Sequence, residues 1–437
     1  MDKNLLLAIL NDWNFWEKDQ VTGIKRVTYL VRLKKIINSE QVIIITGARR
    51  AGKSFLMRQL AKDLIAQGVN KKDILIVNFE DPRFIKLDSG TLEDIDQFYV
   101  KHFNITGAPY IFLDEIQEVK DWEKWVKIRQ EFKKAKIIIS GSNAHLLSHE
   151  LGTALTGRHL DLLVYPLSFK EFVNFQKETG VAETSDQKSF QQYLEFGGFP
   201  KVFFEDSKKE LLLTYFQDVV NRDVVKRYRV RKTEGLKSLI NFYFSNFSNL
   251  ISFSSAAKFL GLTTDTVIKF SQYFSNAYLV FFLKKFSFKV KEQDRSPQKI
   301  YLNDPGLINA VGFKFSDNIG RLLENVVFLE LLRRKSANMD KTNLFYYQDS
   351  QKREVDFVWQ EGKTVKELIQ VAADLHNLKT REREIKTLGK AMSQFGLKHG
   401  LILTQDSEEE IKVGQKIITV KPVYQWLVED RIMNYGA

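Results

Sequence analysis

Short apolar runs alternate with amphipathic helical stretches between residues 41 and 166. The runs are rich in isoleucine, leucine and valine, a pattern typical of strands that are buried on both faces of a parallel sheet. The sequence therefore predicts an α/β fold in which helices cover a parallel sheet. The expected strands are Val42–Thr46, Ile74–Phe79, Tyr110–Leu113, Lys136–Ser140 and Leu160–Tyr165.

The regions around this core have different patterns. Residues 1–40 are amphipathic and predict helix, and residues 168–232 predict mostly helix with a break at 197–200. Residues 233–305 predict a compact unit that begins with helices and continues with a ribbon of alternating basic and aromatic residues at Phe281–Val290. We expect four domains: a core with an N-terminal helical segment (1–167), a helical lid (168–232), a second helical unit (233–312) and a C-terminal α/β domain (313–437).

The last of these domains mixes helices and strands. A long helix is expected from Asn318 to about Arg334, and a charged helix at Lys379–Ser393. The expected strands lie near Leu344–Tyr347, Val355–Trp359, Glu367–Val371 and Gly400–Thr404.

The composition limits the chemistry that the chain can perform. With 437 residues, 44% hydrophobic and 27% charged, it resembles a globular protein of several domains. The absence of cysteine excludes disulfides, thiolate zinc sites and cysteine nucleophiles. The net charge of +12 favours an anionic partner, either nucleic acid or a nucleotide. No stretch approaches the roughly 18 apolar residues that span a bilayer, and Leu5–Leu10 is too short for a signal-peptide core, so we expect a cytoplasmic protein without a membrane partner.

The first expected strand leads into a glycine-rich loop and then a helix, and this loop matches G-x-x-x-x-G-K-[ST] at every defined position. It reads Gly47, Ala48, Arg49, Arg50, Ala51, Gly52, Lys53 and Ser54, with Phe55 opening the helix. The glycines let the backbone approach phosphates, which loop N–H groups and the helix N-terminus attract. Lys53 is expected to reach the β- and γ-phosphates and the Ser54 hydroxyl to bind Mg²⁺. The pattern predicts an ATP and Mg²⁺ site formed by residues 47–55.

A second strand ends in two acids, Asp114 and Glu115. In a P-loop ATPase an Asp at such a strand end holds Mg²⁺, often through water. The neighbouring Glu is placed to polarise the attacking water as a general base. We therefore expect Asp114 to be a metal residue and Glu115 the catalytic base.

Three further polar residues are candidates for catalysis. Ser142 and Asn143 follow the strand at 136–140 and could touch the γ-phosphate or position water, although a plain β-turn explains them as well. Arg158 could act as an arginine finger supplied by a neighbouring subunit. A surface salt bridge explains Arg158 equally well.

Taken together, these motifs resemble AAA+-type ATPases of archaea and bacteria that carry a C-terminal domain of uncharacterised function. The resemblance covers nearly the whole chain. The stretches that carry it are Gly47–Ser54, Asn78–Phe84, Phe112–Gln117 with Trp122, Ser140–Ser142, Gly157-Arg158, Pro166–Phe172, Tyr193–Phe199, Arg222-Asp223, Leu323–Asn325 and Glu354–Phe357.

The resemblance implies an ATPase core related to origin-recognition and STAND-type ATPases, then a winged helix, then a restriction-endonuclease-like domain. It implies ATP as ligand, and some relatives resemble ring-forming assemblies, so a homo-oligomer is among the expected partners. Arg222 could be a second sensor of the γ-phosphate.

Residues 254–274 have the pattern of a helix–turn–helix, with Gly261 in the turn. Thr263, Thr264, Asp265 and Lys269 open or line its second helix, where base edges or phosphates could be met. The ribbon at 278–289 would be a basic wing containing Lys284, Lys285 and Lys289, with Lys291 just beyond, and the run 222–232 is also basic. Two interpretations remain open: binding of duplex DNA through phosphate contacts, or packing of the winged helix within the protein.

The C-terminal pattern resembles the PD-(D/E)XK nuclease fold, with Asp356 as the first acid. Gln370 stands where a second acid is expected, and Ala372 where a lysine is expected. A neutral amide is a poorer Mg²⁺ ligand than a carboxylate, and alanine cannot activate water. Glu324 or Lys379 could compensate, but we expect no nuclease activity.

Three functions follow in order of preference. The first is an ATP-hydrolysing AAA+ ATPase that acts on or binds DNA. The second is a STAND-like regulatory or scaffold protein, in which ATP controls an assembly state, turnover is slow and the partner is a protein. The third is an ATP-driven nuclease, which Gln370 and Ala372 disfavour.

Overall fold

The computed structural model describes residues 2–144, 157–180, 185–312, 319–337 and 342–429. The chain divides into two compact units, residues 1–164 and 165–437. The finer division into four domains stays a prediction, and its boundary at 313 lies outside the described residues. None of the described helices is long and apolar enough to cross a membrane.

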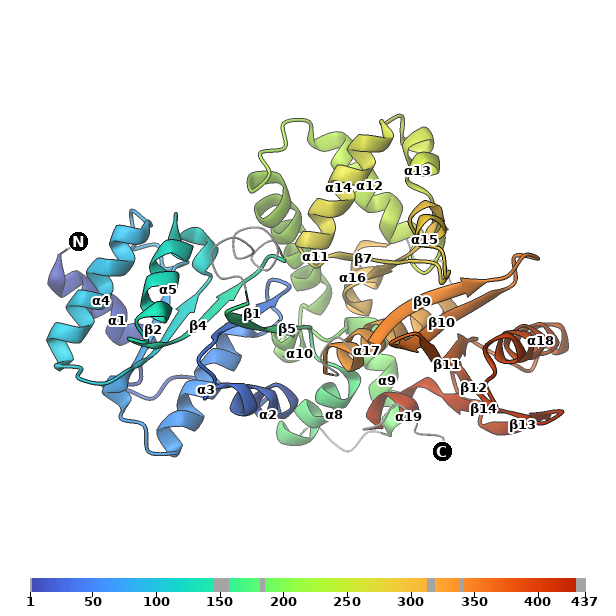
Figure 1. Cartoon of the computed structure of the whole chain (residues 1–437), viewed down its shortest axis with the longest axis horizontal. Helices are drawn as coiled ribbons and strands as arrows, with labels where there is room; N and C mark the ends of the chain where they lie inside the picture. Colours follow the sequence, from blue (N-terminus) through green and yellow to red (C-terminus); the bar gives the residue numbers. More distant parts are fainter. Residues whose placement is uncertain (1, 145–156, 181–184, 313–318, 338–341, 430–437) are drawn as a thin grey trace. The chain divides into compact units, whose positions relative to one another are not determined.

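The first unit is built on a parallel five-stranded sheet in the order β2-β3-β4-β1-β5 (Figure 1). Its strands are β1 (Val42–Gly47), β2 (Ile74–Asn78), β3 (Tyr110–Asp114), β4 (Lys136–Gly141) and β5 (His159–Val164). All six residues of β1 are buried, as expected for an inner strand that is covered on both faces. The predicted parallel sheet is confirmed, and every expected strand is present to within about a residue at each end.

Helices pack on this sheet. They are α1 (Lys3–Trp13), α2 (Val27–Ile36), α3 (Lys53–Ala66), α4 (Ser89–Phe103) and α5 (Trp122–Glu131), with short 3-10 turns η1 (Lys71–Asp73) and η2 (Ile116–Glu118). One hydrophobic core joins α1, α4 and α5 to the face of β1 that carries Val42 and Ile44. The apolar stripe of each helix is therefore buried against the strands.

The prediction that residues 1–40 are helical is confirmed for α1 and α2 and wrong for residues 14–26, which connect them. Asn14 ends α1 and is fully buried. Its amide pairs with the edge strand β2, donating to the Ile76 carbonyl (2.9 Å) and accepting from the Ile76 N–H (2.7 Å). The exposed edge of β2 needs partners for its backbone groups, and Asn14 supplies them.

The second unit begins with helices and contains two sheets. Its helices are α8 (Phe169–Glu178), α9 (Asp186–Phe196), α10 (Pro200–Phe204), α11 (Lys208–Asp218), π-helix η3 (Val219–Lys226), α12 (Thr233–Ser245), α13 (Phe253–Leu260), α14 (Thr264–Asn276), α15 (Val290–Arg295), α16 (Pro305–Val311), α17 (Ile319–Ala337), α18 (Leu378–Phe395) and α19 (Val423–Val428). The expected start of α17 at Asn318 lies outside the described residues.

A three-stranded antiparallel sheet, β6-β8-β7, accompanies α12, α13 and α14. Its strands are β6 (Leu250–Ile251), β7 (Val280–Leu283) and β8 (Gln298–Leu302). The two predicted helices of a helix–turn–helix are present as α13 and α14, and Gly261 between them has a φ of +66°. That left-handed conformation closes α13 and is one that glycine adopts without strain.

The predicted continuous ribbon at Phe281–Val290 is wrong, because β7 ends at Leu283 and Val290 opens α15. Past that point the backbone pairs with another strand. The Phe286 N–H donates to the Tyr346 carbonyl (2.6 Å), and the Tyr346 N–H donates to the Lys284 carbonyl (3.1 Å). The basic segment thus joins β9 of the C-terminal sheet instead of forming a free hairpin.

The C-terminal sheet has six strands in the order β13-β14-β12-β11-β10-β9. They are β9 (Thr342–Gln348), β10 (Glu354–Glu361), β11 (Thr364–Val371), β12 (His399–Thr404), β13 (Glu409–Val413) and β14 (Lys416–Pro422). Strands β9, β10 and β11 form an antiparallel meander, and β11, β12 and β14 run parallel. Helix α18 packs on β10, β11 and β12.

Candidate nucleotide site

The glycine-rich loop joins the end of β1 to the start of α3. At Gly47 φ is +146°, and a Cβ built there would lie 2.0 Å from the Val164 carbonyl oxygen. Gly52 has a φ of +98° just before α3. Both positions therefore require glycine, which leaves the loop N–H groups and the first turn of α3 free of bulky side chains.

Lys53 is buried at the first position of α3. Its ammonium donates to the Gly47 carbonyl (3.1 Å) and to the Ala48 carbonyl (3.2 Å). It also lies 3.4 Å from Oε1 of Glu115. The lysine thus bridges the loop and the predicted catalytic acid.

The two acids at the end of β3 are both buried and in different electrostatic states. Burial and the nearby charge of Glu115 raise the pKa of Asp114, against hydrogen bonds from Ser140 and Ser54. Burial also acts to raise the pKa of Glu115, but the charge of Lys53 and the hydrogen bond from Gln117 outweigh it and lower that pKa. Glu115 is therefore the carboxylate that stays ionised, as a proton acceptor must.

Ser140 is a residue that the sequence reasoning missed. It is the next-to-last residue of β4. Its hydroxyl donates a hydrogen bond to Oδ1 of Asp114, and its Oγ accepts one from the Glu115 N–H at 3.1 Å. Glu115 has a φ of +54°, a strained conformation for a non-glycine residue that this hydrogen bond helps to hold. The signal was in the sequence: Ser140 is the first polar residue after three isoleucines. Ser142 and Asn143, the predicted candidates, are buried just beyond it and make polar contacts.

The other loop residues serve different contacts. Arg49 is nearly buried and donates to Oε1 of Glu80 at 2.7 Å, whereas Arg50 is exposed with a φ of +67°. Ala51 is buried and its carbonyl accepts from Arg26 at 2.9 Å. Phe55 is 41% exposed, so it offers an open apolar surface beside the loop.

The segment between α1 and α2 also lies against the nucleotide loop, which the sequence did not reveal. Gln59 of α3 donates to the carbonyls of Thr22 (2.8 Å) and Ile24 (2.7 Å) and accepts from the Arg26 N–H (3.1 Å). Arg58 donates to the Val21 carbonyl at 3.0 Å. Helix α3 thus holds residues 21–26 next to the loop that its own N-terminus completes.

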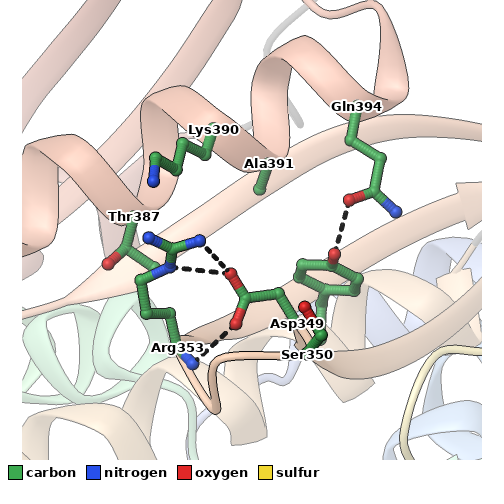
Figure 2. Close-up of a pocket in the computed structure, with 8 residues that line it drawn as sticks. Asp349, Ser350, Arg353, Thr387, Lys390, Ala391 and Gln394 are labelled. Atoms are coloured by element: carbon green, nitrogen blue, oxygen red, sulfur yellow. Dashed lines mark hydrogen bonds and ion pairs between the residues drawn. The ribbon is translucent and has the colours of Figure 1, made fainter.

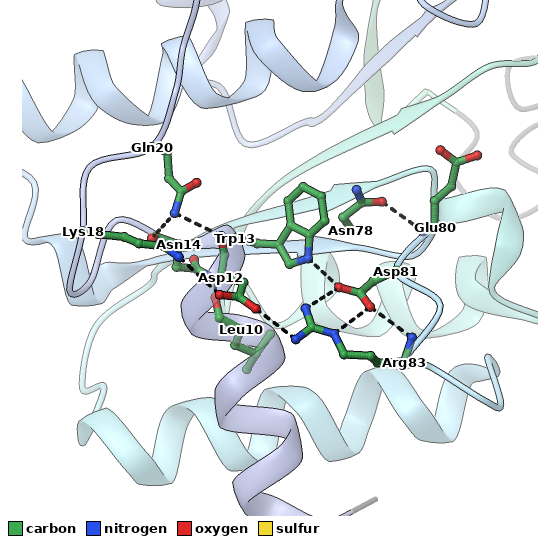
Figure 3. A network of polar contacts seen from close by, with 10 residues as sticks. All are labelled: Leu10, Asp12, Trp13, Asn14, Lys18, Gln20, Asn78, Glu80, Asp81 and Arg83. Atoms are coloured by element: carbon green, nitrogen blue, oxygen red, sulfur yellow. Dashed lines mark hydrogen bonds and ion pairs between the residues drawn. The ribbon is translucent and has the colours of Figure 1, made fainter.

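A polar network fixes α1 next to the residues that follow β2 (Figure 3). Trp13 donates to Oδ2 of Asp81 at 2.9 Å, and Arg83 pairs with both Asp81 and Asp12. The hydrogen bond from Arg83 holds the pKa of Asp81 well below its usual range. The motif Asn78–Phe84 therefore has a structural role: it anchors the N-terminal helix beside Glu80, the partner of the loop arginine.

Arg158 does not lie near the loop of its own chain. It comes just before β5, and its carbonyl accepts from the N–H of Val42 at the start of β1. Gly47 lies at the other end of β1, opposite Val164. Five strand residues at about 3.3 Å each separate the two ends by roughly 17 Å. The predicted finger role of Arg158 therefore requires a second copy of the chain and stays a prediction.

Family models match three parts of the chain. Residues 39–173 match an "AAA domain", residues 187–318 a "Domain of unknown function (DUF8612)" and residues 319–426 a "Domain of unknown function (DUF4143)". "Uncharacterized protein MJ1544" of Methanocaldococcus jannaschii is 35% identical over 449 residues, which is 98% of this chain and 96% of that protein. The chain belongs to the same family as this Methanocaldococcus protein. An "Uncharacterized protein" of Haemophilus influenzae is 32% identical over 360 residues, covering 80% of this chain and 87% of that protein.

Solved structures resemble this chain only distantly. The Aeropyrum pernix ORC1 protein in complex with DNA is 11% identical, with a TM-score of 0.32 over 71% of this chain and 96% of that one. DnaA from Aquifex aeolicus bound to AMPPCP is 13% identical, with a TM-score of 0.31 over 59% of this chain and 91% of that one. Scores this low carry no argument about function. The predicted resemblance to AAA+-type P-loop ATPases is confirmed by the AAA-domain match.

The middle of the second unit has fewer unpaired cations than its sequence suggests. Lys284 pairs with Asp294 at 2.7 Å, and Lys285 pairs with Glu292 at 3.0 Å. Thr263 caps α14 by accepting from the Thr266 N–H, so it has a structural role as well. The predicted basic wing is thus partly neutralised by the acids of α15.

The basic run after η3 is more exposed. Arg229, Arg231 and Lys232 are exposed, and Tyr228 just before them stacks on Tyr273 of α14 with ring centroids 3.7 Å apart. Lys269 of α14 lies 6.0 Å from the Tyr273 ring. These contacts place the basic run next to the second helix of the predicted helix–turn–helix.

Asp356 and Gln370 of the C-terminal domain lie next to each other, together with residues that the sequence did not indicate. Asp356 on β10 and Gln370 on β11 lie on neighbouring strands, and the Asp356 N–H donates to Oε1 of Gln370 at 3.4 Å. Glu324 of α17 and Lys299 of β8 join them. Lys379 is exposed at the start of α18. Among the described residues, no group of three or more acids, histidines or cysteines is arranged to hold a metal ion.

A polar pocket of about 410 Å³ lies between the β9–β10 turn and α18 (Figure 2). Arg353 in its wall binds Oδ2 of Asp349 through Nε (2.7 Å) and a terminal nitrogen (2.6 Å). Tyr347 donates to Gln394 across the pocket at 2.5 Å. Because its arginine is already paired, we assign this pocket no ligand.

Proposed function

We propose that this chain binds ATP with Mg²⁺ at Gly47–Ser54 and hydrolyses the bond between its β- and γ-phosphates to give ADP and phosphate. The supporting observation is that Lys53, Ser54, Asp114, Glu115 and Ser140 gather where the loop and two parallel strands end. This is the edge of a parallel sheet at which such folds bind ligands. Gly52, with a φ of +98°, turns the loop backbone into the N-terminus of α3, where backbone N–H groups attract phosphate oxygens, so the residues present fit the nucleotide.

Each residue has a distinct part in the reaction. Lys53 would turn its ammonium from the loop carbonyls to the β- and γ-phosphate oxygens, with backbone N–H groups of residues 48–54 beside it. Ser54 and Asp114 would hold Mg²⁺, which supplies charge neutralisation to the leaving phosphate. Ser140 keeps both acids oriented through its two hydrogen bonds.

Glu115 is the residue that would accept the proton of the attacking water. Its lowered pKa keeps it ionised at neutral pH, and Gln117 fixes its carboxylate by donating to Oε2 at 2.5 Å. Ser142 and Asn143 would position the water or the γ-phosphate from the end of β4. Arg158 would enter from a neighbouring subunit, which makes a homo-oligomer part of the proposal.

The test is steady-state ATP hydrolysis by the full chain, with Lys53→Ala and Glu115→Gln as variants. We expect Lys53→Ala to lose both ATP binding and turnover. We expect Glu115→Gln to bind ATP and to lose turnover. Turnover equal to wild type in both variants would refute the assignment of this site.

We further propose that the second unit binds duplex DNA through a winged helix formed by α12, α13, α14 and the β6-β8-β7 sheet. The exposed run Arg229, Arg231 and Lys232 beside α14 supports phosphate contacts. The wing makes a smaller contribution, because Lys284 and Lys285 are paired with acids. The AAA-domain ATPase would then act on, or while bound to, DNA.

The pairing of those wing lysines favours a second candidate, a STAND-like switch whose ATP state controls an assembly with a protein partner. ATP turnover with and without duplex DNA at two salt concentrations separates the two. Salt-sensitive stimulation by DNA supports the DNA-acting ATPase, because phosphate contacts release counterions. Turnover that DNA leaves unchanged supports the switch.

A further inference from the structure

A buried lysine lies inside the acid cluster of the C-terminal domain. The side chain of Lys299, on β8, is only 2% exposed. Its Nζ lies 2.8 Å from Oε1 of Glu324, 2.7 Å from Oε1 of Glu354 and 2.7 Å from Oδ1 of Asp356. These three acids come from α17 and β10, so four side chains from three elements meet at one ammonium group.

The carboxylates are held in place by further hydrogen bonds. The hydroxyl of Tyr301 donates to Oε1 of Glu324 at 2.6 Å. The N–H of Val371 donates to Oδ2 of Asp356 at 2.8 Å. Tyr301 is fully buried and Asp356 nearly so, so the cluster is closed to a substrate the size of a nucleic-acid strand.

The geometry is that of an ammonium ion with all its donors used. A lysine ammonium has three N–H donors and no acceptor, and here three carboxylate oxygens lie at charge-assisted hydrogen-bond distance. Burial acts to lower the pKa of Lys299, but Asp356, Glu324 and the other nearby groups raise it well above its usual value. The lysine therefore keeps its charge in spite of its burial.

One of these acids, Asp356, occupies the position where a nuclease of this predicted fold would bind a divalent ion, and Glu324 is the acid that could have compensated for a missing ligand. Gln370 and Ala372 on β11 remove a ligand charge and the usual lysine from that arrangement. Lys299 reaches the cluster from β8, outside the C-terminal sheet. The acids that are present therefore surround a cation that cannot dissociate, because it is a side chain of the same protein.

We propose that the ammonium of Lys299 is the resident cation of this acid cluster, filling the place of a divalent metal ion and fastening β8 to the C-terminal sheet. The domain then needs no metal at this position and performs no hydrolysis there. This inference does not depend on the proposed ATPase activity.

Mn²⁺ binding by the nucleotide-free full chain tests the proposal, with free Mn²⁺ followed by electron paramagnetic resonance. Wild type and Asp356→Asn should bind the same number of Mn²⁺ ions, because any binding near Ser54 and Asp114 is common to both. Lys299→Ala should bind one more Mn²⁺ than wild type, and adding Asp356→Asn should remove that ion. Lys285→Ala, which removes a lysine from an exposed ion pair of the same unit, should match wild type.

The outcomes are decisive even if one variant fails to fold. One more Mn²⁺ bound by wild type than by Asp356→Asn would overturn the proposal, since the cluster would then accept a metal with Lys299 present. A folded Lys299→Ala that gains no Mn²⁺ would also overturn it. If Lys299→Ala gives no soluble protein, equal binding by wild type and Asp356→Asn supports the proposal, and Glu354→Gln, at a less buried position, can replace Asp356→Asn in that comparison.

Discussion

A buried carboxyl group in the C-terminal sheet makes the stability of the second unit depend on pH. Glu367 lies on β11 directly opposite Trp359 of β10, and only 7% of its surface is exposed. Neither Oε1 of Glu367 nor Nε1 of Trp359 has a hydrogen-bond partner among the described residues. Burial raises the pKa of Glu367 to about 7, and the charge of Arg334 only partly opposes this.

The sign and size of the effect follow from that shift. Below about pH 4.5 the carboxyl is protonated in both the folded and the unfolded chain, and it carries no penalty. As pH rises to 7, the unfolded chain ionises first, so the free energy of unfolding falls. The pKa of this carboxyl differs by roughly 2.5 between the folded and the unfolded chain, which corresponds to about 3 kcal/mol of unfolding free energy. The folded state has lost this stability once the pH is above 7. Glu367→Gln cannot ionise, so it should lose about 2.5 kcal/mol less between pH 5 and pH 8 than wild type, the rest of the effect lying below pH 5.

Urea unfolding at pH 5 and pH 8 measures this difference. Fluorotryptophan labelling with ¹⁹F NMR isolates the signal of Trp359, which reports on the second unit alone. Glu361→Gln is the matched control, because Glu361 is exposed at the end of the neighbouring strand β10. Equal pH dependence in wild type and Glu367→Gln would refute the reasoning, because the burial of Glu367 would then carry no electrostatic cost.

Three other predictions concern the two units. Glu115→Gln should reduce kcat by about 10²–10⁴-fold, the usual contribution of a general base, with ATP affinity measured separately by fluorescent-nucleotide titration; an unchanged kcat would reassign the base. Gly197→Ala should destabilise the second unit by more than about 3 kcal/mol, because its Cβ would lie 1.9 Å from Oδ1 of Asp304. A Cβ at Gly261 has no atom within 4 Å, so Gly261→Ala should lower the free energy of unfolding only by the strain of the left-handed conformation, about 1–2 kcal/mol. Equal urea midpoints for the two variants would contradict the predicted clash between residue 197 and Asp304. Replacing Arg231 and Lys232 by glutamate should weaken duplex DNA binding and lower its salt slope by about 1 per lost phosphate contact, and an unchanged slope in filter binding would move the interface elsewhere.

The elements that the sequence predicted are those in which local pattern and final environment agree. The strands of the first unit are apolar because both faces are covered, so their positions follow from composition alone. Strand β13 was missed because Glu409–Val413 lies at the edge of its sheet and carries charged residues that solvent accepts. The break after α1 was missed because its cause, the pairing of Asn14 with Ile76, joins residues 62 positions apart.

The nucleotide residues were predictable for a similar reason, since the loop motif is continuous in sequence. Ser140 could have been recognised as a polar residue at the end of a strand next to β3. Lys299 could not: in the stretch Gln298–Leu302 it alternates with apolar residues and resembles a solvent-facing lysine of an amphipathic strand. Its three acids lie 25, 55 and 57 positions further along the chain, and only the folded structure brings them together.

The end of β5 lies directly against the start of the phosphate loop. The Val164 carbonyl lies so close to Gly47 that no side chain fits between them, and the next residue, Tyr165, already belongs to the second unit. Strand β5 pairs with β1 from His159 to Val164, so Gly47 is held at the end of a paired strand as well as by this close contact. A displacement of the first loop residue on nucleotide turnover would therefore have to move the end of β5 with it, within the sheet of the first unit.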